Sequence, residues 1–255
     1  MKTKLFFLLI VLFTITRVNA QQFITKAVIE YEVKTNLKKN MGGGSFLDMI
    51  DNLPKYKTAY YNFTFANNKS IYKFDYWSDD SKRIPDWWKK NDEENIWYCD
   101  YGTGKLDMQK NIDGNDLNIA DTIPKLKWKI TNENRIIAGF NCRKAVTIIF
   151  DSVYVFAFYT DEIVISGGPC SINGLPGMIL GVTVPRLYTS WIATKVMVNS
   201  VDEKIIKPVS AKKNYDLNFL KTTIIDREKD WYSDDASQND EIRQQKARFL
   251  WQTLL

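Results

Sequence analysis

The chain has 255 residues, with 35 basic and 30 acidic side chains, 14% aromatic residues and no histidine. The absence of histidine excludes Ser-His-Asp and Cys-His catalytic arrangements, zinc sites that use histidine, and any general base whose unperturbed pKa lies near neutrality. An enzyme built on this chain would have to use paired carboxylates, lysine, tyrosine or a bound cofactor.

Residues 1–20, MKTKLFFLLIVLFTITRVNA, have the order of a secretory signal peptide. Lys2 and Lys4 precede a short apolar run, and Ala20 closes the segment where we expect cleavage. The alternative, an uncleaved membrane anchor, is disfavoured because the apolar run is too short to span a bilayer. We therefore expect an exported protein that is periplasmic, associated with the outer membrane, or secreted, with no transmembrane segment after cleavage.

The charge of the mature chain is close to neutral. The leader carries Lys2, Lys4 and Arg17 and no acidic residue, so its removal lowers the formal net charge from +5 to +2. The remaining basic residues are mixed with acidic ones, and we expect no binding of nucleic acid. Residues 21–255 are long enough to bury a substantial core, and we expect them to form a single β-rich domain.

Alternation of apolar and polar residues predicts β-strands in the first third of the mature chain. Residues 26–34 alternate cleanly and predict a half-buried strand, after which residues 36–57, with three consecutive glycines, predict a mobile excursion. Residues 58–66 and 71–77 predict the two strands of a hairpin. The polar stretch 78–94 contains two adjacent tryptophans and predicts a surface loop pinned by aromatic side chains.

The rest of the chain predicts further strands and one helix. Shorter strands are expected at 95–100, 105–110 and 126–130. The strongest β signal lies in residues 141–160, where two runs rich in Val, Ile, Phe and Tyr flank Asp151-Ser152 and predict a hairpin.

The last part of the chain changes its period. After Pro185, residues 189–201 predict a strand. Residues 237–255 have apolar side chains three and four residues apart, and Ser237 with Asp240 resembles a capping box, which predicts an amphipathic helix. The predicted fold is mainly β, a curved antiparallel sheet or partial barrel with a C-terminal amphipathic helix.

Three cysteines, Cys99, Cys142 and Cys170, would enter an oxidising compartment on export. At most one intramolecular disulfide can form among them, which would leave one free thiol. The alternative is three buried free cysteines that pack as small apolar residues. The sequence does not choose between these two alternatives, nor among the three possible pairings.

The segment GPCSINGLPGMILG, residues 168–181, has glycines around a cysteine and a serine. It lacks the spacing of a nucleophile elbow, and its glycines lack the spacing and the Lys-Ser/Thr pair of a phosphate-binding loop. Leu175-Pro176-Gly177 instead matches a type II turn. We expect a rigid corner that sets where the next strand begins, made by Gly174, Leu175, Pro176, Gly177, Met178 and Ile179.

Aromatic residues gather in the first half of the mature chain. They could line a groove for a glycan, a peptide or a lipid, although core packing and loop pinning are favoured. The candidate groove residues are Tyr76, Trp77, Trp87, Trp88 and Trp97. The acidic pairs of the chain lack the twelve-residue calcium-loop pattern, so we assign no catalytic, cofactor-binding or metal-binding residues and expect no cofactor.

The segment NGLPGMIL resembles the hexapeptide of the GLPGLI family, a group of exported Bacteroidota proteins without an established biochemical role. The segments FTFANNKSIYKF, IIAGFNCRKA and VFAFYTDEI resemble family segments in the same order. Met178 replaces a leucine of the family hexapeptide, Phe158 stands where tryptophan is frequent, and Val164 stands where proline is frequent. The resemblance implies export and a β-rich domain, and it supplies no catalytic residues.

From these observations we expect a non-enzymatic envelope protein that acts as an accessory or binding module, for an apolar ligand or for a partner protein of the envelope. The alternative is a periplasmic hydrolase or lyase that depends on carboxylates or a metal. Two or more buried carboxylates converging in one cleft would favour the alternative. The sequence leaves the ligand, the partner and the oligomeric state open.

Overall fold

The computed structural model describes residues 23–40, 53–112, 114–199, 201–209, 211–231 and 240–255. The expected signal peptide, the three consecutive glycines of the expected excursion, and Ser237 of the expected capping box lie outside the described residues. None of the helices in the described ranges is both long enough and apolar enough to cross a membrane.

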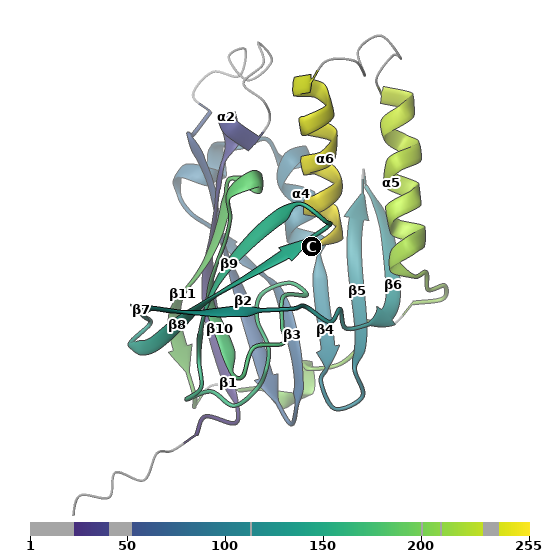
Figure 1. The fold of residues 1–255 in the computed structure, drawn as a ribbon. Helices are drawn as coiled ribbons and strands as arrows, with labels where there is room; N and C mark the ends of the chain where they lie inside the picture. Colours follow the sequence, from purple (N-terminus) through teal and green to yellow (C-terminus); the bar gives the residue numbers. More distant parts are fainter. Residues whose placement is uncertain (1–22, 41–52, 113, 200, 210, 232–239) are drawn as a thin grey trace, which may run out of the picture.

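One antiparallel sheet of eleven strands forms the body of the molecule, as Figure 1 shows, and confirms the mainly β prediction. Its spatial order is β6-β5-β4-β3-β2-β1-β11-β10-β9-β8-β7. The strands are β1 (Ala27–Asn36), β2 (Tyr56–Ala66), β3 (Lys69–Trp77), β4 (Ile96–Asp100), β5 (Lys105–Ile112), β6 (Asn115–Thr122), β7 (Lys129–Ile137), β8 (Phe140–Ile149), β9 (Val153–Thr160), β10 (Met178–Val184) and β11 (Thr189–Met197).

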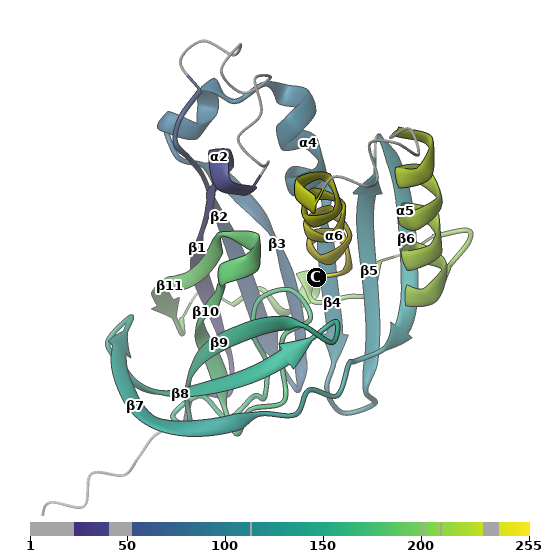
Figure 2. The same ribbon diagram turned by 45° about the horizontal axis from the view of Figure 1, so that its top comes forward.

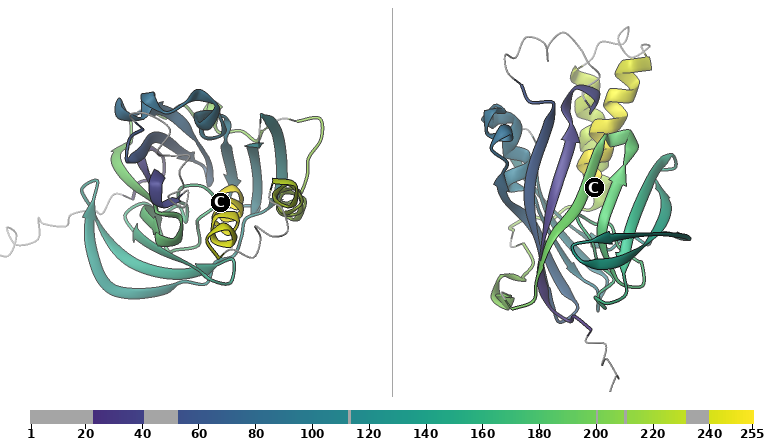
Figure 3. Two further views of the ribbon diagram at one scale, coloured as in Figure 1. Left: turned by 90° about the horizontal axis from the view of Figure 1, so that it is seen from above. Right: turned by 90° about the vertical axis from the view of Figure 1, so that its left-hand side faces the viewer.

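The pairing of β1 with β11 joins the two halves of the chain. Val28 lies opposite Met197 and Thr35 lies opposite Thr189, with a bulge between Glu30 and Tyr31. Every other neighbouring pair of strands is consecutive in sequence. The sheet therefore has two arms, one running from β2 to β6 and the other from β10 to β7, which curve toward each other without closing (Figures 1 and 3).

Two long helices follow the sheet in sequence. Helix α6 (Asp240–Leu254) lies in the concave space between the two arms, and α5 (Leu217–Trp231) lies beside the end of the arm that carries β6 (Figures 2 and 3). Helix α6 agrees with the predicted C-terminal helix. The period of its apolar residues is explained by this position, because one side of the helix packs on the core through Phe249, Leu250 and Leu254.

The predicted hairpins are present. In the β2–β3 hairpin, Asn67 and Asn68 take positive φ angles of 52° and 59°, the conformation that a two-residue type I′ turn requires. In the β8–β9 hairpin the left-handed residues are Phe150 and Asp151, one position earlier than the expected Asp151-Ser152 turn.

Residues 78–94 form helices, so the prediction of a loop there was wrong. They contain a 3-10 turn, η1 (Asp80–Arg83), and the helix α4 (Asp86–Glu94). The signals of a helix start were present in the sequence, because Pro85 precedes the helix and Asp86 lies in its first turn, where it pairs with Lys89 at 2.8 Å. Because most residues of the helix are polar, its apolar residues do not show the period of three to four residues by which a helix is recognised.

Helix α5 and strand β6 were not predicted. The α5 backbone is capped by Asp216, whose carboxylate accepts from the N–H of Phe219 at 2.6 Å, and Leu220 and Ile224 share its buried side. In β6 only Ile119 is buried, so alternation gives a weak signal there. Asn118 and Ala120 exchange backbone hydrogen bonds with Tyr215, which covers part of this sheet edge.

Candidate functional site

A cavity of about 230 Å³ lies inside the curved sheet, and we call it the inner chamber. Its walls come from the concave side of β1 to β5 and β11, from α4 and α6, and from the segment between β9 and β10. These elements are far apart in sequence, and the curvature of the sheet brings them together. The lining mixes aromatic rings with a few charged groups, which is the usual composition of a small-molecule site.

Aromatic rings make up much of the chamber wall. The Tyr61 and Tyr72 rings stack with centroids 5.0 Å apart, and Tyr72 packs against Trp97 at 5.3 Å. Trp88 of α4 and Trp191 of β11 also line the cavity. The chamber therefore offers flat apolar surfaces on several sides.

The structure divides the five aromatic residues proposed from the sequence as a groove. Trp88 and Trp97 both line the inner chamber. Trp77 lies buried beneath α4, whereas Tyr76 is 42% exposed and stacks on Tyr60 on the opposite side of the sheet. Successive residues of a strand point to opposite faces, which separates Tyr76 from Trp77. Trp87 belongs to α4, and its side chain lies outside the described part of the structure.

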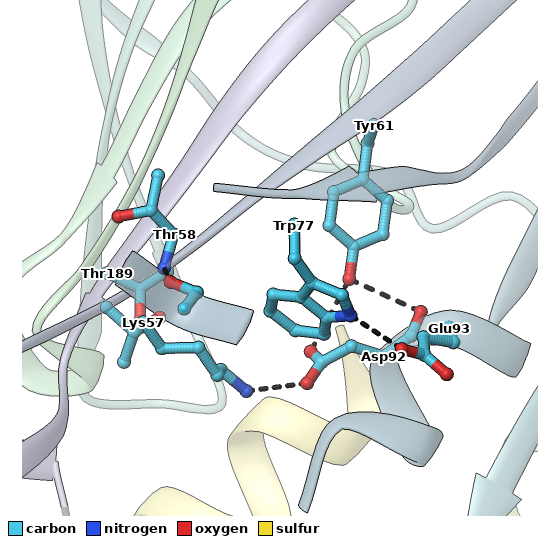
Figure 4. A network of polar contacts seen from close by, with 9 residues as sticks. Lys57, Thr58, Tyr61, Trp77, Asp92, Glu93 and Thr189 are labelled. Atoms are coloured by element: carbon cyan, nitrogen blue, oxygen red, sulfur yellow. Dashed lines mark hydrogen bonds and ion pairs between the residues drawn. The ribbon is translucent and has the colours of Figure 1, made fainter. Parts of the chain in front are cut away.

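Ion pairs and hydrogen bonds fasten the end of α4 to the sheet (Figure 4). Lys57 Nζ lies 2.6 Å from Asp92 Oδ2, and the Tyr61 hydroxyl donates to the other carboxylate oxygen of Asp92 at 3.4 Å. The Trp77 indole donates to Glu93 Oε1 at 2.6 Å. Burial, and then the neighbouring Asp92 charge, raise the pKa of Tyr61 well above its ordinary value, so this hydroxyl stays a donor.

Lys110 of β5 points into the protein interior and reaches the chamber. Its side chain is on the same side of the strand as Leu106, Met108 and Ile112, and it is 2% exposed. The ammonium lies 4.0 Å from the centroid of the Trp97 ring, and among the described residues it has neither a hydrogen bond nor an ion pair. Burial lowers the pKa of Lys110 to about 8, while Cys170 and Asp92 act in the opposite direction.

Tyr72 supplies a second polar group without a partner. The side chain is 1% exposed, and its hydroxyl has no hydrogen-bond partner among the described residues. Burial raises the pKa of Tyr72 well above its ordinary value, with Cys170 as the next cause. A buried hydroxyl without a partner costs about 1–3 kcal/mol, so its presence calls for an acceptor.

The signal for Lys110 was present in the sequence and was missed. In the segment LDMQKNI every second residue from Leu106 faces inward, so an alternation that is otherwise apolar places a lysine in the core. A charged residue in the buried register of a strand is uncommon unless it is paired. Tyr72 gave no such signal, because an aromatic residue is common on the buried face of a strand.

The segment 168–181 contributes Cys170 to the chamber lining and leads into β10, which begins at Met178. Its turn differs from the expected type II turn, because the N–H of Gly177 donates to the carbonyl of Leu175 at 2.7 Å and the N–H of Met178 donates to Ile163. Gly174 and Gly177 have φ angles of +91° and +141°. The motif residues Leu175, Met178 and Ile179 are fully buried, so this segment packs as core around the turn at Pro176.

Cys99, Cys142 and Cys170 are free and buried in the structure. Burial raises the pKa of Cys99 and of Cys170 to about 12 and that of Cys142 to about 11. Cys170 lines the chamber, but a thiol with so high a pKa is a poor nucleophile.

A second cavity, which we call the outer groove, has a volume of about 440 Å³. Its lining is mostly apolar and comes from the tip of the β8–β9 hairpin, the start of α5 and the end of α6, including Ile148, Leu217 and Leu254. Lys221 is its charged lining residue. The two cavities are neighbours, because Cys170 lines the chamber, Ser171 and Ile172 line the outer groove, and Leu255 lines both.

Carboxylates do not converge in the chamber. Asp92 is the acidic residue of its lining and is already held by Lys57 and Tyr61. The buried Glu30 lies on the other side of the sheet, where Thr194 donates to it at 2.5 Å. Over the ranges that the structure describes, no group of three or more Cys, Asp or Glu side chains is placed to hold a metal ion.

Comparison with known proteins gives a family and a fold. The family model described as "N-glycanase peptide, N-terminal domain" matches residues 90–226, just over half of the chain. Two solved structures of PNGF-II, in space groups C2 and P21, match with TM-scores of 0.52 and 0.51 and 16% sequence identity. The match covers 77% of this chain but only 32% of each PNGF-II chain. No curated protein matches the sequence.

Proposed function

Because the chain belongs to the family of N-glycanase peptide N-terminal domains, we propose that it is an exported, non-enzymatic accessory module of the bacterial envelope that binds a small ligand in the inner chamber. The observation that carries this proposal is a pair of polar groups among aromatic walls. The buried Tyr72 hydroxyl has no hydrogen-bond partner among the described residues, and the 2% exposed Lys110 has no ion pair or hydrogen bond within the same part of the chain. Such groups are costly in a core and favourable in a ligand site.

The accessory role is supported by the kind of family to which the chain belongs. The family description concerns one domain of an N-glycanase, and the PNGF-II chains are about three times longer than the part that this chain matches. Export is supported by the leader at residues 1–20 and by the resemblance of NGLPGMIL to the GLPGLI family. The ligand or partner that such a module serves would then be met in the periplasm or at the outer membrane.

The experiment is native mass spectrometry of the mature protein purified from its own periplasm, followed by denaturing mass analysis. We expect a small ligand to co-purify. The Gln252→Trp variant fills the chamber from α6 and should lose the ligand, whereas Gln244→Trp on the exposed side of the same helix should keep it. A protein that carries no ligand and takes none from a periplasmic extract would overturn the proposal, as would equal retention by both variants.

The outer groove supports a second candidate function, the carriage of an apolar ligand such as a fatty acid. Its apolar lining and its volume of about 440 Å³ fall within the range of small-molecule sites. Uptake of a fluorescent fatty acid tests it. Ile148→Asp places a charge at the groove and should abolish uptake, whereas Ile136→Asp, at an exposed residue of β7 away from the groove lining, should not. Lack of uptake by the unmodified protein would exclude this function.

A hydrolase or lyase is less well supported by the chamber. General acid–base chemistry needs a carboxylate free to exchange a proton with the substrate, and Asp92 is engaged by an ammonium and a phenol. The Asp92→Asn variant offers a direct test. If the unmodified protein hydrolyses a substrate and Asp92→Asn abolishes this hydrolysis, the enzymatic alternative is favoured over the binding module.

A further inference from the structure

We propose that the inner chamber is a carboxylate site, in which Lys110 and Tyr72 bind the anionic group of a small organic acid and the aromatic walls hold its flat apolar body. This inference rests on the proposed function, since both require the chamber to admit a ligand. It adds the chemical class of that ligand and the two residues that recognise it.

The first step is that Lys110 has no counter-ion among the described residues. The inward register of β5 is filled by Leu106, Met108 and Ile112, so an apolar residue at position 110 would complete the core. The contact with Trp97 compensates part of the cost of burying the ammonium, because a cation–π contact contributes about 0.5–2 kcal/mol. Buried charges in proteins are as a rule paired or hydrogen-bonded. The ammonium of Lys110 can therefore still accept an anionic partner.

The second step is that a further donor belongs to the same cavity lining, on a side chain that packs against the same tryptophan. Trp97 packs against both side chains, since its ring centroid is 4.0 Å from the ammonium of Lys110 and 5.3 Å from the centroid of the Tyr72 ring. The hydroxyl of Tyr72 remains protonated and has no acceptor among the described residues. An ammonium and a phenol on one side of a cavity supply one donor for each oxygen of a carboxylate.

The third step is the charge balance of the lining. Its charged side chains are Lys57, Asp92 and Lys110, and the first two pair with each other at 2.6 Å. Lys110 is thus the charged side chain of the lining that has no ion pair among the described residues. The main-chain oxygen of Leu255, which also belongs to the lining, accepts from the Trp97 indole at 2.8 Å, so a ligand anion would supply the first direct partner of the ammonium. A phosphate dianion would bring a second charge and a third oxygen, for which the lining provides no further cation.

The size and walls of the chamber define the rest of the ligand. A cavity of about 230 Å³ is below the range of about 300–1,000 Å³ that is typical of drug-sized ligands, so the ligand is small. Tyr61, Trp88 and Trp191 line the cavity together with Trp97. Rings of this kind pack well against a flat apolar group. A monocyclic carboxylic acid therefore fits the charge, the donors and the shape.

The test uses 4-fluorobenzoate and its neutral analogue 4-fluorobenzamide as probes, with binding to the mature protein followed by ¹⁹F NMR. We expect the carboxylate to bind at least tenfold more tightly than the amide. Lys110→Gln should remove this preference, and Tyr72→Phe should weaken carboxylate binding severalfold. The matched control, Lys105→Gln, changes an exposed lysine on the same strand and should leave the preference intact.

A second measurement needs no substitution. With ¹³C-labelled lysine, the titration of Lys110 should move to higher pH when 4-fluorobenzoate is bound, because a nearby anion favours the ammonium. Equal binding of the carboxylate and the amide, no binding of the carboxylate at millimolar concentration, tighter binding of inorganic phosphate, or an unchanged titration would each overturn the inference. If a native ligand is displaced by Gln252→Trp but not by Lys110→Gln, the binding function stands and the carboxylate assignment fails.

Discussion

The ammonium of Lys110 lies 4.0 Å from the centroid of the Trp97 ring, inside a sheet in which both side chains are at most 5% exposed. The indole of Trp97 also donates to a main-chain oxygen of Leu255, the last residue of the sequence, at 2.8 Å and packs on Tyr72. One tryptophan thus links β3, β4 and β5 to the segment that ends α6. The ring on which the lysine packs is therefore held by a strand of the first half of the chain and by its last residue.

The burial of Lys110 predicts a pH-dependent stability. Its pKa falls from 10.5 to about 8 in the folded protein, so between these values the unfolded chain binds more protons than the folded one and stability rises with pH. Below pH 8 the full penalty applies, on the order of 3 kcal/mol. In urea unfolding, the stability of Lys110→Met relative to the unmodified protein should therefore fall by about this amount from pH 7 to pH 10.5.

Lys105→Met provides the control, because Lys105 is exposed on the same strand. Its stability curve should run parallel to that of the unmodified protein over the same pH range. Parallel curves for Lys110→Met as well would show that the ammonium pays no desolvation cost in the folded protein, and the description of Lys110 as a buried, unpaired cation would be wrong.

The three thiols predict an opposite effect at alkaline pH. Burial raises the pKa of Cys99 and Cys170 from 9.0 to about 12, so the folded protein keeps protons that the unfolded chain releases above pH 9. The stability that this provides is complete below pH 9 and is lost as the pH rises toward 12. Cys170→Ala should reduce the loss by on the order of 1 kcal/mol per pH unit in that window, measured by urea unfolding.

The same thiols should be inert in the folded protein. Iodoacetamide at pH 8 is expected to modify none of them without denaturant and all three in concentrated urea, as read by intact mass. Rapid modification of one thiol under native conditions would contradict the burial of that residue. A mass corresponding to a disulfide in protein taken from the periplasm would show that the oxidised alternative applies there.

The strands could be predicted from the sequence because burial on one face of a sheet imposes a period of two, as in the KAVIEYEVK segment, where Ala27, Ile29 and Tyr31 are buried. Helix α4 could not be recognised in the same way. Much of it is polar, and it is held to the sheet by contacts of Trp77, Tyr61 and Lys57, which come from strands before it. Those contacts join residues that are distant in sequence, so no local pattern indicates them.

The inner chamber was beyond sequence reasoning for a related reason. Tyr72, Lys110, Cys170 and Trp191 come from four separate regions of the chain, and only the curvature of the sheet makes them neighbours. The aromatic content of the segment 76–101 suggested a groove, but the alternation along β3 places Tyr76 outside. A lysine in an apolar register was the one local signal of the site, since it breaks a rule of burial rather than matching a motif.

Gly177 predicts a steric effect at the start of β10. It has a φ of +141°, and a Cβ at this position would overlap the carbonyl oxygen of Thr160. Gly177→Ala should therefore cost more than the roughly 1 kcal/mol of an unfavourable backbone conformation alone. Gly104→Ala is the matched control, because its φ is +72° and its Cβ would meet no atom within 4 Å. Equal loss of thermal stability in the two variants would mean that the contact with Thr160 can relax.

The tie between Trp77 and Glu93 predicts local control of α4. The indole donates at 2.6 Å to a carboxylate near the end of the helix, and a charge-assisted bond of this kind contributes about 1.5–3 kcal/mol. Trp77→Phe removes the donor, so hydrogen–deuterium exchange over residues 86–94 should become faster while exchange in the β8–β9 hairpin stays unchanged. Because Trp88 and Asp92 of this helix line the chamber, binding of 4-fluorobenzoate should weaken as well.

Trp128→Phe tests whether this effect is specific to α4. The Trp128 indole donates to the carbonyl of Asn173 at 2.8 Å, so the variant also loses one partly buried indole hydrogen bond, but between residues outside α4. It should lower global stability without faster exchange over residues 86–94. If both variants accelerate exchange there, α4 opens only with global unfolding, and the hydrogen bond to Glu93 does not hold the chamber wall in place.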